Sequence, residues 1–109
     1  MGMVINRFEV YLVNLDPTVG SEIKKTRPAV IISPDEINYN LNTVIIAPMT
    51  TGGKNYPSRI TCEFKGKTGK IVLDQLRTVD KIRLIKKVGS ISRITQDHLC
   101  DLLCKLFQK

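Results

Sequence analysis

Residues 20–32, GSEIKKTRPAVII, join a charged loop directly to an apolar strand. The second part, residues 29–32, is a continuous apolar run rich in β-branched side chains, which is typical of a buried strand. Pro28 fixes its own φ and pushes Arg27 toward an extended backbone, so Arg27 stands where the loop meets the core. An arginine held there beside the loop carboxylate of Glu22 fits an anion-binding site. The same pattern also fits the ordinary beginning of a strand.

Length and charge limit the class of protein. The 109 residues suffice for one domain with a single core. The formal net charge of +7, from 17 Lys and Arg against 10 Asp and Glu, favours a polyanionic partner such as nucleic acid, an anionic membrane surface or an acidic protein. The alternative is a basic soluble protein that binds nothing through its charge.

The chain carries no signal for a membrane or for secretion. No apolar run reaches the roughly 18 residues of a membrane helix, and residues 1–7 lack the apolar core of a signal peptide. Three cysteines, an odd number without a pairing motif, suit a reducing compartment. We therefore expect a soluble, cytoplasmic protein.

Most of the chain reads as short strands. We expect them at residues 8–15, 29–33, 43–48, 59–64, 70–73 and 76–79, with a last strand or edge at 88–91. The connection at 16–26, about ten residues, exceeds the usual hairpin loop, which favours a functional role. On the first strand, Phe8, Val10 and Leu12 share one face.

Two helices are expected. Ser33 as N-cap and Pro34 at the first position predict a short helix after the second strand. Thr95 as N-cap predicts a terminal helix through about residue 107, with Ile94 and Leu99 placed for a hydrophobic staple. Leucines at 99, 102, 103 and 106 form the apolar stripe of this helix.

The sequence argues against several kinds of catalytic site. The only histidine is His98, and the cysteines at 62, 100 and 104 have leucine neighbours or stand alone, so we expect no metal and no cofactor. No glycine-rich phosphate loop is present. What remains is a site of Arg27, Glu22, Thr50 and Thr51. Such a site fits RNA, because the 2′-hydroxyl of RNA supplies its own nucleophile.

Four motifs follow one another along the chain: DPTVGSE at 16–22, RPAV at 27–30, PMTT at 48–51 and KNYP at 54–57. In order and in spacing they resemble those of the MazF/PemK-type toxins of bacterial toxin–antitoxin pairs. The similarity extends from about residue 8 into the terminal helix. The resemblance implies one toxin domain over residues 1–109, mainly β: a small SH3-like, partly open β-barrel with a short helix after the second strand and a C-terminal helix.

The resemblance also implies an activity. It indicates a sequence-specific endoribonuclease, or mRNA interferase, that works as a homodimer without metal and leaves a 2′,3′-cyclic phosphate and a 5′-hydroxyl. Arg27 and Thr50 take the catalytic positions of the family motifs. Glu22 is the first candidate for the general base, and Asp74 is the second. The expected substrate-binding residues are Ser21, Thr51, Lys54, Tyr56, Asp74, Gln75 and Arg77.

Two of these residues keep a plain alternative. Tyr56 is the best candidate for stacking on a base, yet it also fits a loop anchor packed on the barrel. Lys54 fits a phosphate contact or a solvated side chain.

The implied partners are single-stranded RNA, a second copy of the chain and an antitoxin with an acidic, partly disordered tail. The positive charge fits both RNA and such a tail. The competing hypothesis is a non-enzymatic toxin of the same fold that inhibits DNA gyrase by binding. The terminal helix ends in KLFQK without an evident polar binding surface, which counts against that alternative.

Overall fold

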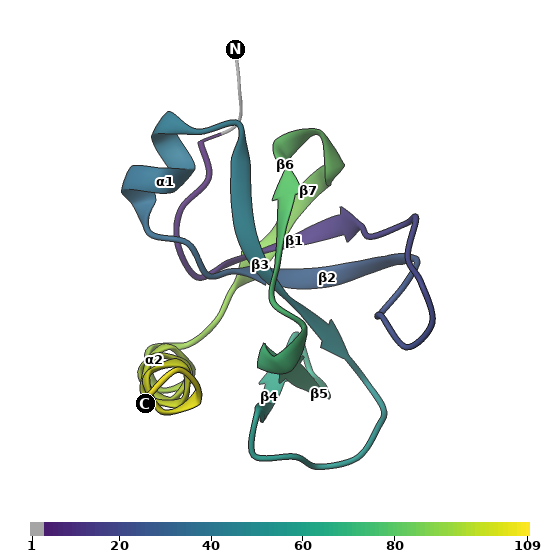
Figure 1. The fold of residues 1–109 in the computed structure, drawn as a ribbon, viewed down its shortest axis with the longest axis vertical. Helices are drawn as coiled ribbons and strands as arrows, with labels where there is room; N and C mark the ends of the chain where they lie inside the picture. The colour runs from purple at the N-terminus through teal and green to yellow at the C-terminus, as the bar shows by residue number, and fades with distance from the viewer. Residues whose placement is uncertain (1–3) are drawn as a thin grey trace.

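The computed structural model describes residues 4–109, which form a mainly β half-barrel with two α-helices (Figure 1). Its elements in chain order are β1 (Glu9–Asn14), β2 (Thr26–Ile31), α1 (Asp35–Asn40), β3 (Thr43–Thr50), β4 (Arg59–Phe64), β5 (Lys67–Val72), the 3-10 turn η1 (Leu73–Gln75), β6 (Arg77–Asp80), the 3-10 turn η2 (Lys81–Arg83), β7 (Leu84–Ser90) and α2 (Arg93–Leu106). The predicted fold class is confirmed: α1 follows β2, and α2 ends the fold. No helix within residues 4–109 is long and apolar enough to cross a membrane.

Strand β3 connects the two halves of the sheet. The strand order is β4-β5-β3-β2-β1-β7, and β6 also pairs with β3. The first half of β3 pairs with β6 and its middle pairs with β2, whereas its last two residues, Met49 and Thr50, pair with β5. All these pairings are antiparallel. Because β3 changes partners along its length, its C-terminal end emerges between the β1–β2 half and the β4–β5 half (Figure 1).

Both faces of the central strands are buried. One cluster contains Val10, Val30 and Leu99, and a second cluster on the opposite face contains Val13 and Ile31. Successive side chains of a strand point to opposite faces, so two-sided burial requires a continuous apolar run. This is the pattern that the sequence shows at 29–32. Helix α2 covers the first cluster beside β4 (Figure 1).

The predicted N-cap of the first helix is wrong. Helix α1 begins at Asp35 with Pro34 as its N-cap and without a side-chain cap bond. Ser33 is buried instead: its hydroxyl donates to Asn38 Oδ1 at 2.5 Å and accepts from the backbone N–H of Ile45 at 3.0 Å. The Ser33 hydroxyl bonds to buried polar groups between α1 and β3, so it makes no capping bond to the backbone of α1.

The start of the terminal helix is also corrected. Ser92, three residues before the predicted cap, accepts a bond from the backbone N–H of Thr95 at 3.3 Å. Ile94 is 83% exposed, so it forms no staple with the buried Leu99; Ile91 is buried in the same core cluster as Leu99. Both Ser92 and Thr95 are suitable N-cap residues, and in the structure the helix begins after Ser92, directly following the buried Ile91.

The strand predictions differ mainly at the edges. The range predicted for β4, 59–64, is confirmed, whereas β3 continues to Thr50, β5 begins at Lys67 and β7 runs over Leu84–Ser90. The missed parts of β5 and β7 carry exposed lysines and glycine, so their apolar pattern is weak. Pairing with β4 and β1 holds them as strands.

Candidate functional site

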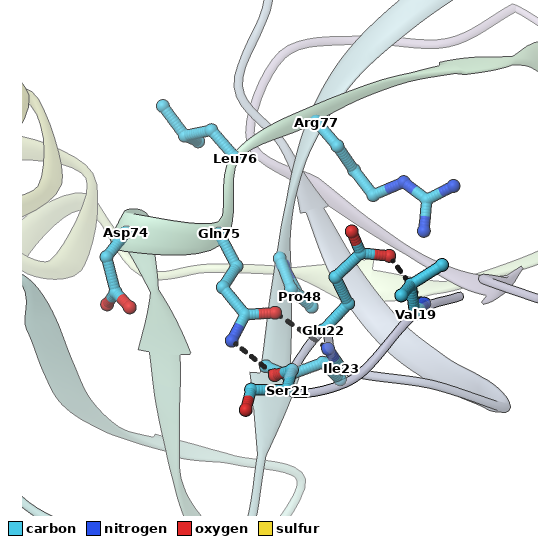
Figure 2. Close-up of a pocket in the computed structure, with 9 residues that line it drawn as sticks. All are labelled: Val19, Ser21, Glu22, Ile23, Pro48, Asp74, Gln75, Leu76 and Arg77. Atoms are coloured by element: carbon cyan, nitrogen blue, oxygen red, sulfur yellow. Dashed lines mark hydrogen bonds between the residues drawn. The ribbon is translucent and has the colours of Figure 1, made fainter.

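The end of β3 opens into a cleft of about 480 Å³, called here the main cleft. It is lined by Ser21, Glu22, Ile23, Lys24, Arg27, Thr50, Thr51, Gly52, Gly53, Arg59 and Gln75. A neighbouring cleft of about 560 Å³ is lined by Val19, Ser21, Glu22, Ile23, Pro48, Asp74, Gln75, Leu76 and Arg77 (Figure 2). Four residues line both clefts and therefore lie between them: Ser21, Glu22, Ile23 and Gln75.

Arg27 is the second residue of β2, and the pairing of β2 with β1 places it opposite Val13. The side chain is half-buried, and its Nε donates to the carbonyl oxygen of Lys24 at 2.9 Å. Its two Nη nitrogens find no acceptor within residues 4–109, and no carboxylate of this part of the chain forms an ion pair with it. The guanidinium is thus anchored at one nitrogen and free to bind an anion with the others.

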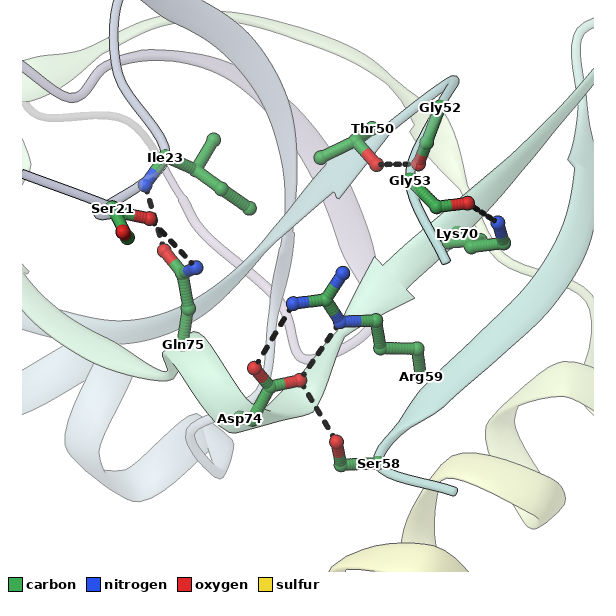
Figure 3. A network of polar contacts seen from close by, with 10 residues as sticks. All are labelled: Ser21, Ile23, Thr50, Gly52, Gly53, Ser58, Arg59, Lys70, Asp74 and Gln75. Carbon is green, nitrogen blue, oxygen red and sulfur yellow. Dashed lines mark hydrogen bonds and ion pairs between the residues drawn. The ribbon is translucent and has the colours of Figure 1, made fainter. Parts of the chain in front are cut away.

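Thr50 is the last residue of β3 and pairs with Lys70 of β5. Its hydroxyl donates to the carbonyl oxygen of Gly52 at 2.9 Å, which folds the start of the β3–β4 loop back over the strand end (Figure 3). A Cβ on Gly69 would stand 2.8 Å from the carbonyl oxygen of Thr50. This close approach needs a residue without a side chain.

Glu22 lies at the exposed tip of the β1–β2 loop. Its Oε1 accepts the backbone N–H of Val19 at 2.9 Å, and its own N–H donates to the carbonyl oxygen of Val19 at 3.2 Å. These two bonds make a tight local turn. The second carboxylate oxygen has no hydrogen-bond donor among the described residues, so it remains available to a ligand.

Gln75 of η1 holds this loop through two backbone bonds. Its Oε1 accepts the N–H of Ile23 at 2.7 Å, and its Nε2 donates to the carbonyl oxygen of Ser21 at 3.2 Å (Figure 2). The amide pairs with the loop as a neighbouring strand would. This contact, across more than fifty positions of sequence, fixes Glu22 between the two clefts.

An ion pair joins Arg59, which lines the main cleft, to Asp74, which lines the neighbouring cleft. Nε and Nη2 of Arg59 donate to Oδ1 and Oδ2 of Asp74 at 3.1 and 3.3 Å, and Ser58 donates to Oδ1 at 2.9 Å (Figure 3). The hydrogen bond from Arg59, more than the bond from Ser58, holds the pKa of the Asp74 carboxyl below its ordinary value. The guanidinium lies over the ring of Tyr56, 5.0 Å from its centroid.

The structure brings most of the predicted site together. Ser21, Glu22, Arg27, Thr50, Thr51 and Gln75 line the main cleft, whereas Asp74 and Arg77 line the neighbouring cleft. Arg77 is engaged by the backbone, since its Nη1 donates to the carbonyl oxygen of Leu15 at 2.8 Å. Lys54 and Tyr56 line neither cleft, and Tyr56 packs against Arg59.

Sequence reasoning missed two cations. Lys24 and Arg59 line the main cleft with Arg27, and Glu22 is its single carboxylate. The sign of the charge suits a polyanion. Arg59 was expected only as the start of a strand; its position after a glycine-rich loop is a weak signal. Residues 4–109 contain no group of three His, Cys, Asp or Glu that could hold a metal ion, and the prediction of no metal stays a prediction.

Comparison with known proteins shows the family of this chain. Residues 6–107 match the family model described as the PemK-like, MazF-like toxin of type II toxin–antitoxin systems. The chain belongs to this family. A curated relative, the endoribonuclease MazF of Staphylococcus epidermidis, is 40% identical over 108 residues, which span 91% of this chain and 90% of the relative.

Solved MazF structures share the fold at low identity. A crystal structure of MazF from Deinococcus radiodurans superposes with a TM-score of 0.86 at 23% identity, covering 99% of this chain and 100% of that one. A mycobacterial endoribonuclease in complex with its cognate antitoxin gives a TM-score of 0.78 at 20% identity, with coverage of 93% and 92%. These structures confirm the fold, whereas the family model and the curated relative confirm the resemblance of the sequence motifs to the MazF/PemK family.

Proposed function

We propose that this chain is a metal-independent, sequence-specific endoribonuclease toxin that cleaves single-stranded RNA. The observation that carries the proposal is the meeting of Arg27, Thr50 and Glu22 in one basic cleft. These residues come from β2, the end of β3 and the β1–β2 loop, and all three line the same cleft of about 480 Å³. The 40% identical relative bears the name endoribonuclease, which supports the same conclusion.

The proposed reaction uses the RNA's own 2′-hydroxyl. Its oxygen attacks the adjacent phosphorus, its proton passes to the carboxylate of Glu22, and the bond from phosphorus to the 5′-oxygen breaks. The products are a 2′,3′-cyclic phosphate and a 5′-hydroxyl that gains its proton from solvent. The Nη nitrogens of Arg27 hold the non-bridging oxygens as negative charge grows there. The Thr50 hydroxyl turns its single proton from the carbonyl oxygen of Gly52 to the phosphate and donates a further bond.

Glu22 is a better base than Asp74 in this arrangement. Both oxygens of Asp74 accept bonds from Arg59, and its lowered pKa makes it a weaker proton acceptor. Glu22 has one oxygen without a donor among the described residues. Asp74 therefore serves to position Arg59.

Partners follow from the charge of the cleft. Lys24, Arg27 and Arg59 line the surface that RNA occupies. An acidic antitoxin tail that lies along this surface blocks RNA by competing for the same cations. The proposal includes a homodimer, which is what the family resemblance implies.

The test is cleavage of a long single-stranded RNA in EDTA. Arg27→Ala is expected to lower kcat/KM by about 10²–10³, because it removes the donors at the developing charge. Sequencing of the new ends gives the recognition motif, and analysis of the 3′ ends is expected to find cyclic phosphate.

Arg93→Ala is the matched control. Arg93 lies on α2, is 86% exposed and pairs only with Asp97, so its loss removes one positive charge away from the cleft. Equal cleavage by wild type and Arg27→Ala would refute the catalytic role. No cleavage by a folded, antitoxin-free wild type would favour the binding inhibitor of DNA gyrase instead.

A further inference from the structure

Arg59 has one edge of its guanidinium occupied and the other open. Nε and Nη2 face the two oxygens of Asp74 side-on. A guanidinium carries five N–H donors, and this pairing uses two of them. Nη1 finds no acceptor within residues 4–109, so the end formed by Nη1 and the outer hydrogen of Nη2 is unpaired.

The open end faces the main cleft. Arg59 lines that cleft together with Arg27 and Thr50. In Figure 3 the third guanidinium nitrogen points away from Asp74, toward the side on which Thr50 and Gly53 lie. A Cβ on Gly53 would stand 3.4 Å from Nη1, so the absence of a side chain at this position keeps the space in front of Nη1 clear.

The guanidinium is held stiffly before any ligand arrives. Asp74 fixes its plane, Ser58 fixes Asp74, and the Tyr56 ring lies beneath it. The Arg59 side chain is only 19% exposed. A donor that is already ordered loses little conformational entropy when it binds, and this favours a specific contact over a diffuse attraction.

We propose that the open end of Arg59 binds an RNA phosphate next to the scissile one, in a two-pronged contact. The end-on pair of nitrogens matches two oxygens of a phosphate. Arg27 has no carboxylate partner among the described residues and suits the growing charge of the reaction. The carboxylate of Asp74 offsets the charge of Arg59. The remaining N–H donors of Arg59 therefore act mainly by their direction and position the RNA strand. This proposal rests on the proposed function, because it needs RNA in the main cleft.

The test separates Arg59 from a change in net charge. The double variant Arg59→Met/Asp74→Asn removes one positive and one negative charge, so the net charge stays at the wild-type value. Its affinity is measured by fluorescence anisotropy on RNA with a 2′-deoxy nucleotide at the cleavage site, which binds without being cut. We expect roughly tenfold weaker binding, as for loss of a charge-assisted hydrogen bond.

Arg59→Lys is the milder second variant. It keeps the charge but offers no planar pair of donors, so its binding is also expected to weaken several-fold. Arg93→Ala is again the matched control and should bind as the wild type does. With cleavable RNA, both Arg59 variants should raise KM more than they lower kcat, because a neighbouring phosphate positions the strand.

The recognition motif distinguishes phosphate from base. A phosphate contact weakens cleavage equally at every site of a long RNA, so sequencing should return the wild-type motif. A changed motif, or unchanged affinity in both Arg59 variants, would overturn the proposal. Failure of the wild type to cut RNA would instead overturn the proposed function. The two failures can be told apart, because the binding measurement uses RNA that is not cut.

Discussion

At the scale of single residues, Thr50 owes its position to the absence of a side chain at Gly69. β5 passes so close to the end of β3 that a Cβ on Gly69 would meet the Thr50 carbonyl oxygen at 2.8 Å. Backbone, not a flexible side chain, is the obstacle. Any larger residue must therefore shift the backbone where β5 meets the end of β3, next to the Thr50 hydroxyl that we propose to be catalytic.

Gly69→Ala is expected to lower kcat/KM for RNA cleavage by about ten- to a hundredfold, because small displacements of a catalytic group are costly. Thr61→Ala, an exposed position on the adjacent strand β4, serves as the control. Circular dichroism checks that both variants are folded. If a folded Gly69→Ala protein cleaved RNA with the wild-type kcat/KM, the prediction would be wrong, because displacement of the end of β3 would not impair Thr50.

Residue chemistry and the family motifs predict roles for Arg27 and Thr50, but they leave several roles open for Asp74. A carboxylate beside a glutamine in a short turn fits a base, a ligand contact or a structural partner. Only the fold brings Arg59 against it, and the hydrogen bonds from that guanidinium lower its pKa. A neighbour fifteen residues away in sequence thus decides what the carboxylate can do.

At the scale of elements, η1 controls the β1–β2 loop. The N–H of Ile23 donates to Gln75 Oε1, and the carbonyl oxygen of Ser21 accepts from Gln75 Nε2. Residues 18–24 have no strand pairing of their own. The amide of Gln75 therefore supplies bonds that hold Glu22 between the two clefts.

Gln75→Ala is expected to speed hydrogen exchange of the Ile23 amide by roughly five- to tenfold, as for loss of one hydrogen bond of about 1 kcal/mol. The exchange is measured by NMR on the free protein. Gln96→Ala provides the comparison, since it removes a glutamine bond to the carbonyl oxygen of Ile91 away from the loop. An unchanged Ile23 rate would mean that the loop is held by its own turn.

At the scale of the whole molecule, the first and last strands of the chain lie side by side. β1 pairs with β7, and Glu9 of β1 forms an ion pair with Lys87 of β7 at 2.6 Å. Burial raises the pKa of Glu9, but hydrogen bonds from Lys87 and from the Asn6 backbone outweigh it and keep the pKa below its ordinary value of 4.5. The native state thus favours the charged carboxylate.

This contact predicts acid sensitivity. A lowered native pKa stabilises the fold above the unfolded-state pKa, and the stabilisation is lost as the pH falls through the lower native value. Glu9→Gln is expected to reduce the free energy of unfolding at pH 7 by about 1–3 kcal/mol, with a smaller gap near pH 3. Urea unfolding at both pH values measures this, with the exposed Glu63→Gln as control. If the free energies of unfolding of the wild type and Glu9→Gln differed by the same amount at both pH values, the predicted dependence on the ionisation of Glu9 would be wrong.

The sequence by itself determined the class of fold and the family, and it predicted Arg27, Thr50 and Glu22 as the centre of the site. Continuous apolar runs specify buried strands because both faces of the central sheet are covered, and the motifs carry Arg27, Thr50 and Glu22 as a set. The tertiary structure alone decided the helix caps, the hydrogen-bond partners of Asp74 and the place of Arg59 in the main cleft. These depend on partners that are distant along the chain, and the energy of a hydrogen bond depends on which donor and acceptor the fold brings within reach.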